Sequence, residues 1–182
     1  MDGVLVVLLA VVLLVAVSIL AYQARTGVPA MSSNSEEAVD VAGLLKQAGV
    51  PEQAIIYELG SGWGKIVIAL ADAFPNAQIR GIELSPFPYW IARLRTRNRP
   101  NVRLLRRNFY DCDLRDADAV TCYLMMKPMP KLAAFLDAML RPGTPVVSLT
   151  FWFRGREVAE KRNGPGLRGE AALYYWPGKP PE

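Results

Sequence analysis

The 182-residue chain contains no histidine and only two cysteines, Cys112 and Cys122. The absence of histidine excludes His-ligated metal sites, Ser-His-Asp triads and any histidine general base. The cysteines do not form a C-x-x-C pair, so they give no metal signature, and they suit a reducing compartment. We therefore expect a protein that works without a metal ion.

Charge is absent from one long stretch, Gly3 to Tyr22, which is twenty residues long. As a helix this stretch would be ~30 Å long, the thickness of the hydrocarbon core of a bilayer. A buried core helix this apolar does not suit so small a domain. A cleaved signal peptide fits poorly too, because Asp2 replaces the usual basic residues, the apolar run is too long and no small-x-small cleavage site follows. We predict an uncleaved transmembrane anchor over residues 1–22.

Residues 23–34 are polar and turn-rich, which predicts a linker before a domain at 35–182. Arg25 follows the apolar run and Asp2 precedes it, which favours a cytoplasmic location for the domain. After the anchor the chain has 21 basic and 16 acidic residues, a net charge of +5 that suits the anionic inner leaflet. We expect a single-pass protein of the inner (cytoplasmic) membrane, with the bilayer as one partner.

Strand and helix patterns alternate through the domain. The periodicity predicts strands at 54–59, 77–84, 102–108, 117–125 and 144–153, and helices at 65–74, 89–99 and 129–140. A helix also begins near Ser35, which we expect to be its N-cap. Residues 154–178 resemble two short strands around "NGPG". The pattern predicts an α/β fold with a doubly wound, mostly parallel sheet and an antiparallel C-terminal edge hairpin.

A glycine-rich turn, "YELGSGWGKIV" at residues 57–67, joins the first strand to the next helix. It is not a Walker A loop, since leucine occupies position 59 and isoleucine position 66. It is not the G-x-G-x-x-G dinucleotide fingerprint either, because the glycines are spaced G-x-G-x-G. That shorter spacing after an acidic strand end is the pattern of S-adenosylmethionine binding. The candidate cofactor residues here are Glu58, Gly60, Ser61, Gly62 and Gly64.

Two further positions extend this prediction. Glu83 lies 23 residues after Gly60, at the end of the second strand, where a carboxylate accepts hydrogen bonds from both ribose hydroxyls. After the third strand, Asn108 is placed to bond the exocyclic amine of an adenine, and the Phe109 backbone N–H to bond a ring nitrogen. Glu58 would attract the ammonium group of the methionine part. An ordinary turn asparagine is the competing interpretation of Asn108.

These elements in this order resemble the class I, seven-β-strand methyltransferases, whose fold is Rossmann-like. The segments "VPAMSSNSEEAV", "YELGSGWGKIVIA" and "GIELSPFPYWIARLR" also resemble the small membrane-anchored protein-lysine methyltransferases that act on the ATP synthase c-subunit and the adenine nucleotide translocase. The resemblance implies S-adenosylmethionine as methyl donor and S-adenosylhomocysteine as product. It also places Leu84, in the E-L-x-P element, in the cofactor site.

Residues at the end of the fourth strand normally hold the methyl acceptor. Here they are "YLMMK" at 123–127, and Tyr123 is the candidate catalytic residue that orients the target amine. The D/N-P-P-Y/F motif of adenine and glutamine N-methyltransferases is absent. Trp63 either walls the methionine end of the cofactor or shields the turn.

Seven arginines lie within fifteen residues, and they could form a solvated helix face or contact anionic lipid: Arg93, Arg95, Arg97, Arg99, Arg103, Arg106 and Arg107. No aromatic residues alternate with them as stacking platforms, so we expect no nucleic-acid partner. The chain is predicted to be an anchored methyltransferase that modifies lysine in a membrane-associated protein. The alternatives are a lipid or small lipophilic substrate, and a non-catalytic module that binds the cofactor.

Overall fold

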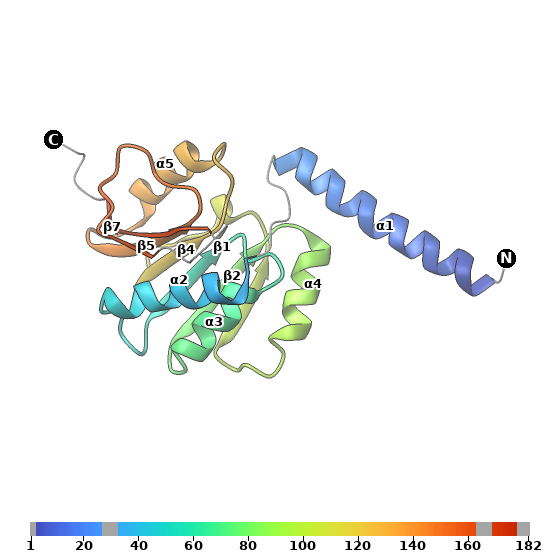
Figure 1. Cartoon of the computed structure of the whole chain (residues 1–182), viewed down its shortest axis with the longest axis horizontal. Coiled ribbons are helices and arrows are strands. Elements are labelled where there is room, and N and C mark those ends of the chain that lie inside the picture. Colours follow the sequence, from blue (N-terminus) through green and yellow to red (C-terminus); the bar gives the residue numbers. More distant parts are fainter. Residues whose placement is uncertain (1–2, 27–32, 163–168, 178–182) are drawn as a thin grey trace.

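The computed structural model describes residues 3–26, 33–162 and 169–177. It contains one seven-stranded sheet in the order β3-β2-β1-β4-β5-β7-β6 (Figure 1). The strands are β1 Ile55–Leu59, β2 Gln78–Glu83, β3 Val102–Arg106, β4 Ala119–Cys122, β5 Thr144–Leu149, β6 Glu160–Arg162 and β7 Ala171–Trp176.

The five strands β1 to β5 are parallel, and β7 pairs antiparallel with both β5 and β6. The predicted mostly parallel sheet with an antiparallel C-terminal hairpin is therefore confirmed. The "NGPG" turn expected inside that hairpin lies at 163–166, outside the described residues. β1 lies inside the sheet, with β2 on one side and β4 on the other, so the order of the strands reverses there. Ligands of open α/β sheets bind beside such a point, at the carboxyl ends of the strands.

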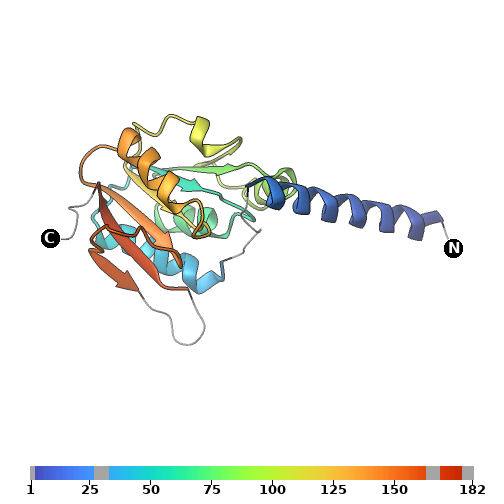
Figure 2. The same cartoon turned by 90° about the horizontal axis from the view of Figure 1, so that it is seen from above.

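The helices are α1 Gly3–Thr26, α2 Ser35–Gln47, α3 Lys65–Ala73, α4 Pro86–Arg95 and α5 Met129–Met139, with a short 3₁₀ helix, η1, at Phe109–Asp111. α1 projects away from the sheet, as Figure 2 shows. Its segment Gly3–Tyr22 is long and apolar enough to cross a membrane, and none of it is buried in the protein. The helix continues four residues past the predicted end of the anchor.

Asn34, not Ser35, caps α2, so the predicted N-cap was wrong by one residue. The Asn34 side chain accepts a hydrogen bond from the Glu37 backbone N–H at 2.7 Å, and the Glu37 carboxylate accepts one from the Asn34 N–H at 2.7 Å. This reciprocal capping box satisfies two backbone donors and outweighs a lone serine cap. It fixes the start of α2 close to the carboxyl ends of the strands.

The helix predicted at 89–99 begins and ends earlier, as α4. Pro86 and Pro88 lie in its first turn, where a missing backbone N–H costs nothing, so the prolines do not delay the helix. At the other end the Thr96 hydroxyl donates to the Ala92 carbonyl at 2.9 Å, and the chain turns. This earlier start of the helix matters because α4 then begins almost directly after Glu83.

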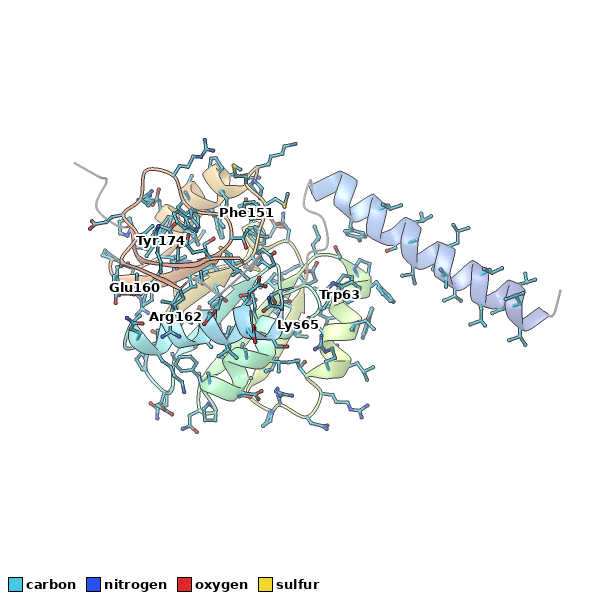
Figure 3. The ribbon with its side chains drawn as sticks, viewed as in Figure 1. Trp63, Lys65, Phe151, Glu160, Arg162 and Tyr174 are labelled. Carbon is cyan, nitrogen blue, oxygen red and sulfur yellow. The ribbon has the colours of Figure 1, made fainter. Side chains whose placement is uncertain are left out.

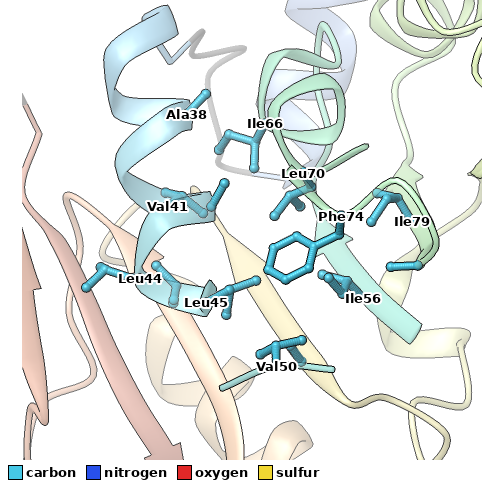
Figure 4. Packing of buried hydrophobic residues seen from close by; sticks show 14 of the residues in the cluster. Ala38, Val41, Leu44, Leu45, Val50, Ile56, Ile66, Leu70, Phe74 and Ile79 are labelled. Atoms are coloured by element: carbon cyan, nitrogen blue, oxygen red, sulfur yellow. The ribbon is translucent and has the colours of Figure 1, made fainter. Parts of the chain in front are cut away.

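Two apolar clusters cover the two faces of the sheet. One contains α2 and α3 side chains such as Leu45 and Leu70 packed on Ile56 of β1 (Figure 4). The other packs α5, through Leu132 and Leu136, on the opposite face. Because side chains alternate along a strand, Glu58 lies on the same face as Ile56, toward α2 and α3. A carboxylate is thereby placed inside an apolar layer.

Candidate active site

The glycine turn leaves β1 in a conformation that only glycine adopts easily. Gly60, Gly62 and Gly64 have φ values of 79°, 48° and 82°. The backbone N–H groups of Gly60 and Ser61 both donate to the Ile82 carbonyl at 2.9 Å, which ties the turn to β2. A Cβ on Gly64 would lie 3.0 Å from the Cβ of Ala92, so α4 also packs directly on the turn. The turn is fixed by its neighbours before any ligand is considered.

Glu58 is a buried carboxylate that takes part in no ion pair within the described residues. Its side chain is 1% exposed, and the Thr121 hydroxyl on the adjacent strand donates a short hydrogen bond to it. Burial raises the pKa of Glu58 to about 8; the Thr121 hydrogen bond lowers it and the charge of Glu83 raises it further. An unpaired buried carboxylate is unfavourable for folding. Its retention at a strand end indicates a ligand that carries a positive charge.

A small pocket opens against Glu58. Its lining residues come from the segment before α2, the end of β1, the glycine turn, the start of α3 and the residue after β4: Ser33, Glu58, Gly60, Ser61, Gly62, Trp63, Lys65, Ile66 and Tyr123. Figure 3 shows Trp63 and Lys65 at the beginning of α3, beside α4. The Trp63 ring contacts Phe87 of α4 edge-on, with ring centroids 5.8 Å apart. Four of the predicted cofactor residues, Glu58, Gly60, Ser61 and Gly62, therefore share one pocket with Tyr123.

Sequence reasoning missed several members of this site. Ser33 was assigned to the linker, yet it is 5% exposed and lines the pocket. Lys65 was not among the predicted site residues, and Thr121 was treated as an ordinary strand residue. The Pro/Ser-containing stretch in the family resemblance was the available signal for Ser33. Thr121 could not be found, because its contact with Glu58 depends on the register of β1 and β4.

Glu83 lies at the end of β2 and braces the glycine turn. One carboxylate oxygen accepts from the Gly62 N–H at 2.8 Å and the other from the Ser85 N–H at 2.7 Å. A carboxylate has about four acceptor positions, so two remain for a ligand. The next residue, Leu84, is partly buried between β2 and α4. Neither residue lines the small pocket; both lie at the neighbouring strand end.

Asn108 and Phe109 follow β3 at the next strand end. The Asn108 side-chain oxygen accepts from the Tyr110 N–H at 3.2 Å, so it caps η1. The Phe109 ring packs on Tyr110 at a centroid distance of 4.4 Å. The competing interpretation of Asn108 as an ordinary turn asparagine therefore accounts for this one hydrogen bond. The side-chain oxygen of Asn108 has a second lone pair, which remains for a ligand. The carboxyl ends of β1, β2 and β3 thus form a row of Glu58, Glu83 and Asn108.

Tyr123 follows β4 and is half-buried. Burial raises the pKa of its phenol, the neighbouring Thr150 side chain lowers it, and the charge of Glu37 raises it. Thr150 has a φ of 69°, a costly backbone conformation for a β-branched residue. Glu37 in turn accepts from the Gly169 N–H at 2.9 Å, which links the α2 cap to β7. Backbone strain of this kind is concentrated at functional sites.

These residues fit S-adenosylmethionine. Glu58 supplies a buried negative charge for an ammonium group, and the Ser61 hydroxyl is buried in the same pocket without a hydrogen-bond partner among the described residues. The glycine turn lines the same pocket with backbone atoms that carry no side chain, so a ligand can approach them closely. The next strand ends add a carboxylate and an amide, which suit a ribose and an adenine.

Comparison with known proteins agrees with this geometry. The ANTKMT methyltransferase domain family matches residues 58–160. A protein-lysine N-methyltransferase of Saccharolobus islandicus (strain REY15A) is 30% identical over 127 residues, which is 66% of this chain and 79% of that protein.

Solved structures show the same fold. An RNA methyltransferase from Salinibacter ruber in complex with S-adenosyl-L-homocysteine superposes with a TM-score of 0.68 at 31% identity, covering 78% of this chain and 93% of that one. TrmN from Thermus thermophilus, at 16% identity and a TM-score of 0.57 over 74% and 47% of the two chains, shares the fold alone. The chain is an S-adenosylmethionine-dependent methyltransferase and belongs to the ANTKMT methyltransferase domain family.

Proposed function

We propose that the protein transfers methyl groups to lysine side chains of a membrane-associated protein, while α1 holds it in the cytoplasmic membrane. The observation that carries the proposal is the buried Glu58 in a pocket shared with the glycine turn and Tyr123. The lysine substrate is supported by the match to the ANTKMT family and by the name of the Saccharolobus islandicus relative.

Each residue of the site has a separate role in holding the donor. Glu58 pairs with its ammonium group, and the backbone of Gly60, Ser61, Gly62 and Gly64 lies beneath it. Glu83 accepts from the ribose hydroxyls, with Leu84 beside it. Asn108 and the Phe109 N–H contact the adenine. The donor itself supplies a methyl group already activated on a sulfonium, so the chain has to position and desolvate the acceptor.

Tyr123 orients the acceptor amine. A lysine has a pKa of ~10.4 in water, so its amine must lose a proton before it can attack. Removal from water lowers that pKa, because burial disfavours the charged form. The half-buried phenol of Tyr123, which lines the same pocket as Glu58, would accept a hydrogen bond from the incoming amine. The amine then presents its lone pair toward the pocket that Glu58 lines.

Anchoring would raise the local concentration of a substrate in the same membrane. The apolar surface of α1 supports this assignment, since large side chains such as Leu14 are exposed, Leu14 by 73%. The methyl donor is a cytosolic metabolite, which supports a cytoplasmic location for the domain. The basic domain suits the anionic leaflet there.

One comparison favours a second substrate class. The Salinibacter ruber protein is named an RNA methyltransferase, and this chain carries a cluster of arginines after β2. A lipid acceptor would also suit an anchored enzyme. The test must therefore separate protein, RNA and lipid as acceptors.

The experiment uses the full chain reconstituted in lipid discs with methyl-labelled S-adenosylmethionine. Membrane protein, RNA and lipid extracts are offered separately, and the labelled product is hydrolysed and identified. We expect label in protein, recovered as Nε-methyllysine, and its loss in the Glu83→Ala variant. Label recovered only in RNA or only in lipid would refute the lysine assignment while leaving the methyltransferase intact. Absence of label in all three would favour a module that only binds the cofactor.

A further inference from the structure

One face of α4 exposes large apolar side chains beside arginines. Trp90 and Leu94 are 56% and 57% exposed, and they lie four residues apart, on the same side of the helix. Arg93, also exposed, lies between them in sequence, with its guanidinium 5.4 Å from the centre of the Trp90 ring. Arg97 follows in the exposed turn after the helix. We refer to Trp90, Arg93, Leu94 and Arg97 as the α4 surface.

Within the described residues, no carboxylate neutralises the charges of the α4 surface. The ion pairs within the described residues use other arginines, namely Arg80, Arg99, Arg115, Arg141 and Arg156. Arg93 donates instead to the Tyr89 hydroxyl at 3.2 Å, and no acidic side chain of the described chain pairs with Arg93 or Arg97. A cationic surface with apolar residues at its centre is therefore left open to a partner.

The α4 surface lies close to the apolar helix. α1 contacts α4, and both views show the end of α1 that joins the domain next to α4 (Figures 1 and 2). Because none of the segment Gly3–Tyr22 is buried, that helix needs an apolar environment outside the protein. A bilayer around α1 would bring lipid headgroups to the neighbouring helix.

The chemistry of the α4 surface matches such headgroups. Tryptophan prefers the boundary between hydrocarbon and water, where its ring is buried and its N–H remains hydrated. Leucine enters the same boundary, and arginines beside it contact lipid phosphates. An RNA surface would favour arginines alternating with several stacking rings, whereas α4 has one exposed ring beside one exposed leucine.

We propose that the α4 surface is a second membrane contact, in which Trp90 and Leu94 enter the headgroup layer and Arg93 and Arg97 bind anionic phospholipid. The contact would also orient the active site. The first turn of α4 holds Trp63 through Phe87, and Arg95 donates to the Trp63 carbonyl at 2.8 Å. A domain resting on α4 thus keeps the wall of the small pocket near the membrane surface, where a membrane protein presents its lysines. The inference rests on the proposed membrane attachment but not on the identity of the acceptor.

The two native cysteines make a direct test possible. Cys112 and Cys122 are both buried, so a nitroxide label reacts selectively with an introduced exposed cysteine. We would label three single variants of the full chain: Leu94→Cys on the α4 surface, Ala138→Cys as a matched exposed control on α5, and Val12→Cys inside α1. Each is placed in discs of pure phosphatidylcholine and in discs with phosphatidylglycerol. The collision rates of each label with oxygen and with a soluble nickel chelate then show how deeply that label is immersed in the bilayer.

We expect the label at 94 to show several-fold less nickel collision than the label at 138 in anionic discs. That difference should shrink in neutral discs and in the background of Arg93→Gln and Arg97→Gln. Equal collision at 94 and 138 in anionic discs would overturn the proposal, whatever the label at 12 reports. A label at 12 in hydrocarbon with a label at 94 in water would retain the anchor and refute only the α4 contact. None of these readings depends on methyl transfer, so failure here is distinct from failure of the proposed activity.

Discussion

Replacement of Glu58 by glutamine should stabilise the cofactor-free protein while weakening cofactor binding. Folding raises the pKa of Glu58 from 4.5 to about 8, mainly through burial. A raised carboxyl pKa means that the unfolded chain ionises first, so the penalty is zero below pH 4.5, grows as pH rises and becomes constant above pH 8. At pH 7 it amounts to roughly 3 kcal/mol. Glutamine keeps the size of the side chain and the hydrogen bond from Thr121 but has no charge to bury.

The assay is the melting temperature of the full chain between pH 5 and pH 8.5, with and without S-adenosylhomocysteine. Glu58→Gln should melt on the order of 10 °C higher than the parent at pH 7 without ligand, and the gain should shrink toward pH 5. With saturating ligand the gain should shrink toward zero, because loss of a charge-assisted hydrogen bond weakens binding by about 1.5–3 kcal/mol. Glu157→Gln, at an exposed glutamate, serves as the control and should change neither value. A Glu58→Gln melting temperature that is unchanged or lower at every pH would refute the buried, unpaired carboxylate.

Three further predictions concern neighbouring residues. Glu83→Ala should weaken S-adenosylmethionine binding by about 1.5–3 kcal/mol, as measured by calorimetry. It should also lower the stability of the domain, since the backbone N–H groups of Gly62 and Ser85 lose their acceptor. An unchanged affinity would show that Glu83 does not bind the ribose. Gly64→Ala should destabilise the domain by about 1–3 kcal/mol in denaturant unfolding, because its φ is 82° and the new Cβ would lie 3.0 Å from the Cβ of Ala92; Gly3→Ala, with no atom within 4 Å, is the matched control. Tyr123→Phe should lower kcat at least tenfold with little effect on cofactor affinity; an equal loss in both would make Tyr123 a structural residue of the pocket.

The sequence predicted the parts of this protein that depend on local pattern. The G-x-G-x-G spacing identified Glu58 and the turn. The distance from Gly60 to the end of the second predicted strand identified Glu83. Both patterns depend on residues near one another in the chain. Predictions failed where contacts with neighbouring residues determine the boundary of a helix. Asn34 replaced Ser35 as the cap because its partner Glu37 completes a reciprocal pair, and α4 began early because its prolines fall in the first turn.

The contacts that define the pocket could not be predicted, because they join distant segments. Thr121 meets Glu58 only through the parallel register of β1 and β4. Thr150 and Tyr123 come from two different strand ends, and Ser33 reaches the pocket from the segment before α2. These residues are ordinary by type, so composition and spacing give no signal for them. Their importance follows from the buried carboxylate that they surround.

The most direct test of lysine methylation on a membrane protein is the methylation state of membrane proteins in cells that lack the gene. Mass spectrometry of membrane fractions should reveal a lysine that is methylated in the parent, unmodified in the deletion strain and methylated again when the gene is restored. Restoration with Glu83→Ala should leave it unmodified. If every methylated lysine persists in the deletion strain while a methylated nucleoside or lipid disappears, the protein is a methyltransferase of a different substrate and the proposed function is wrong.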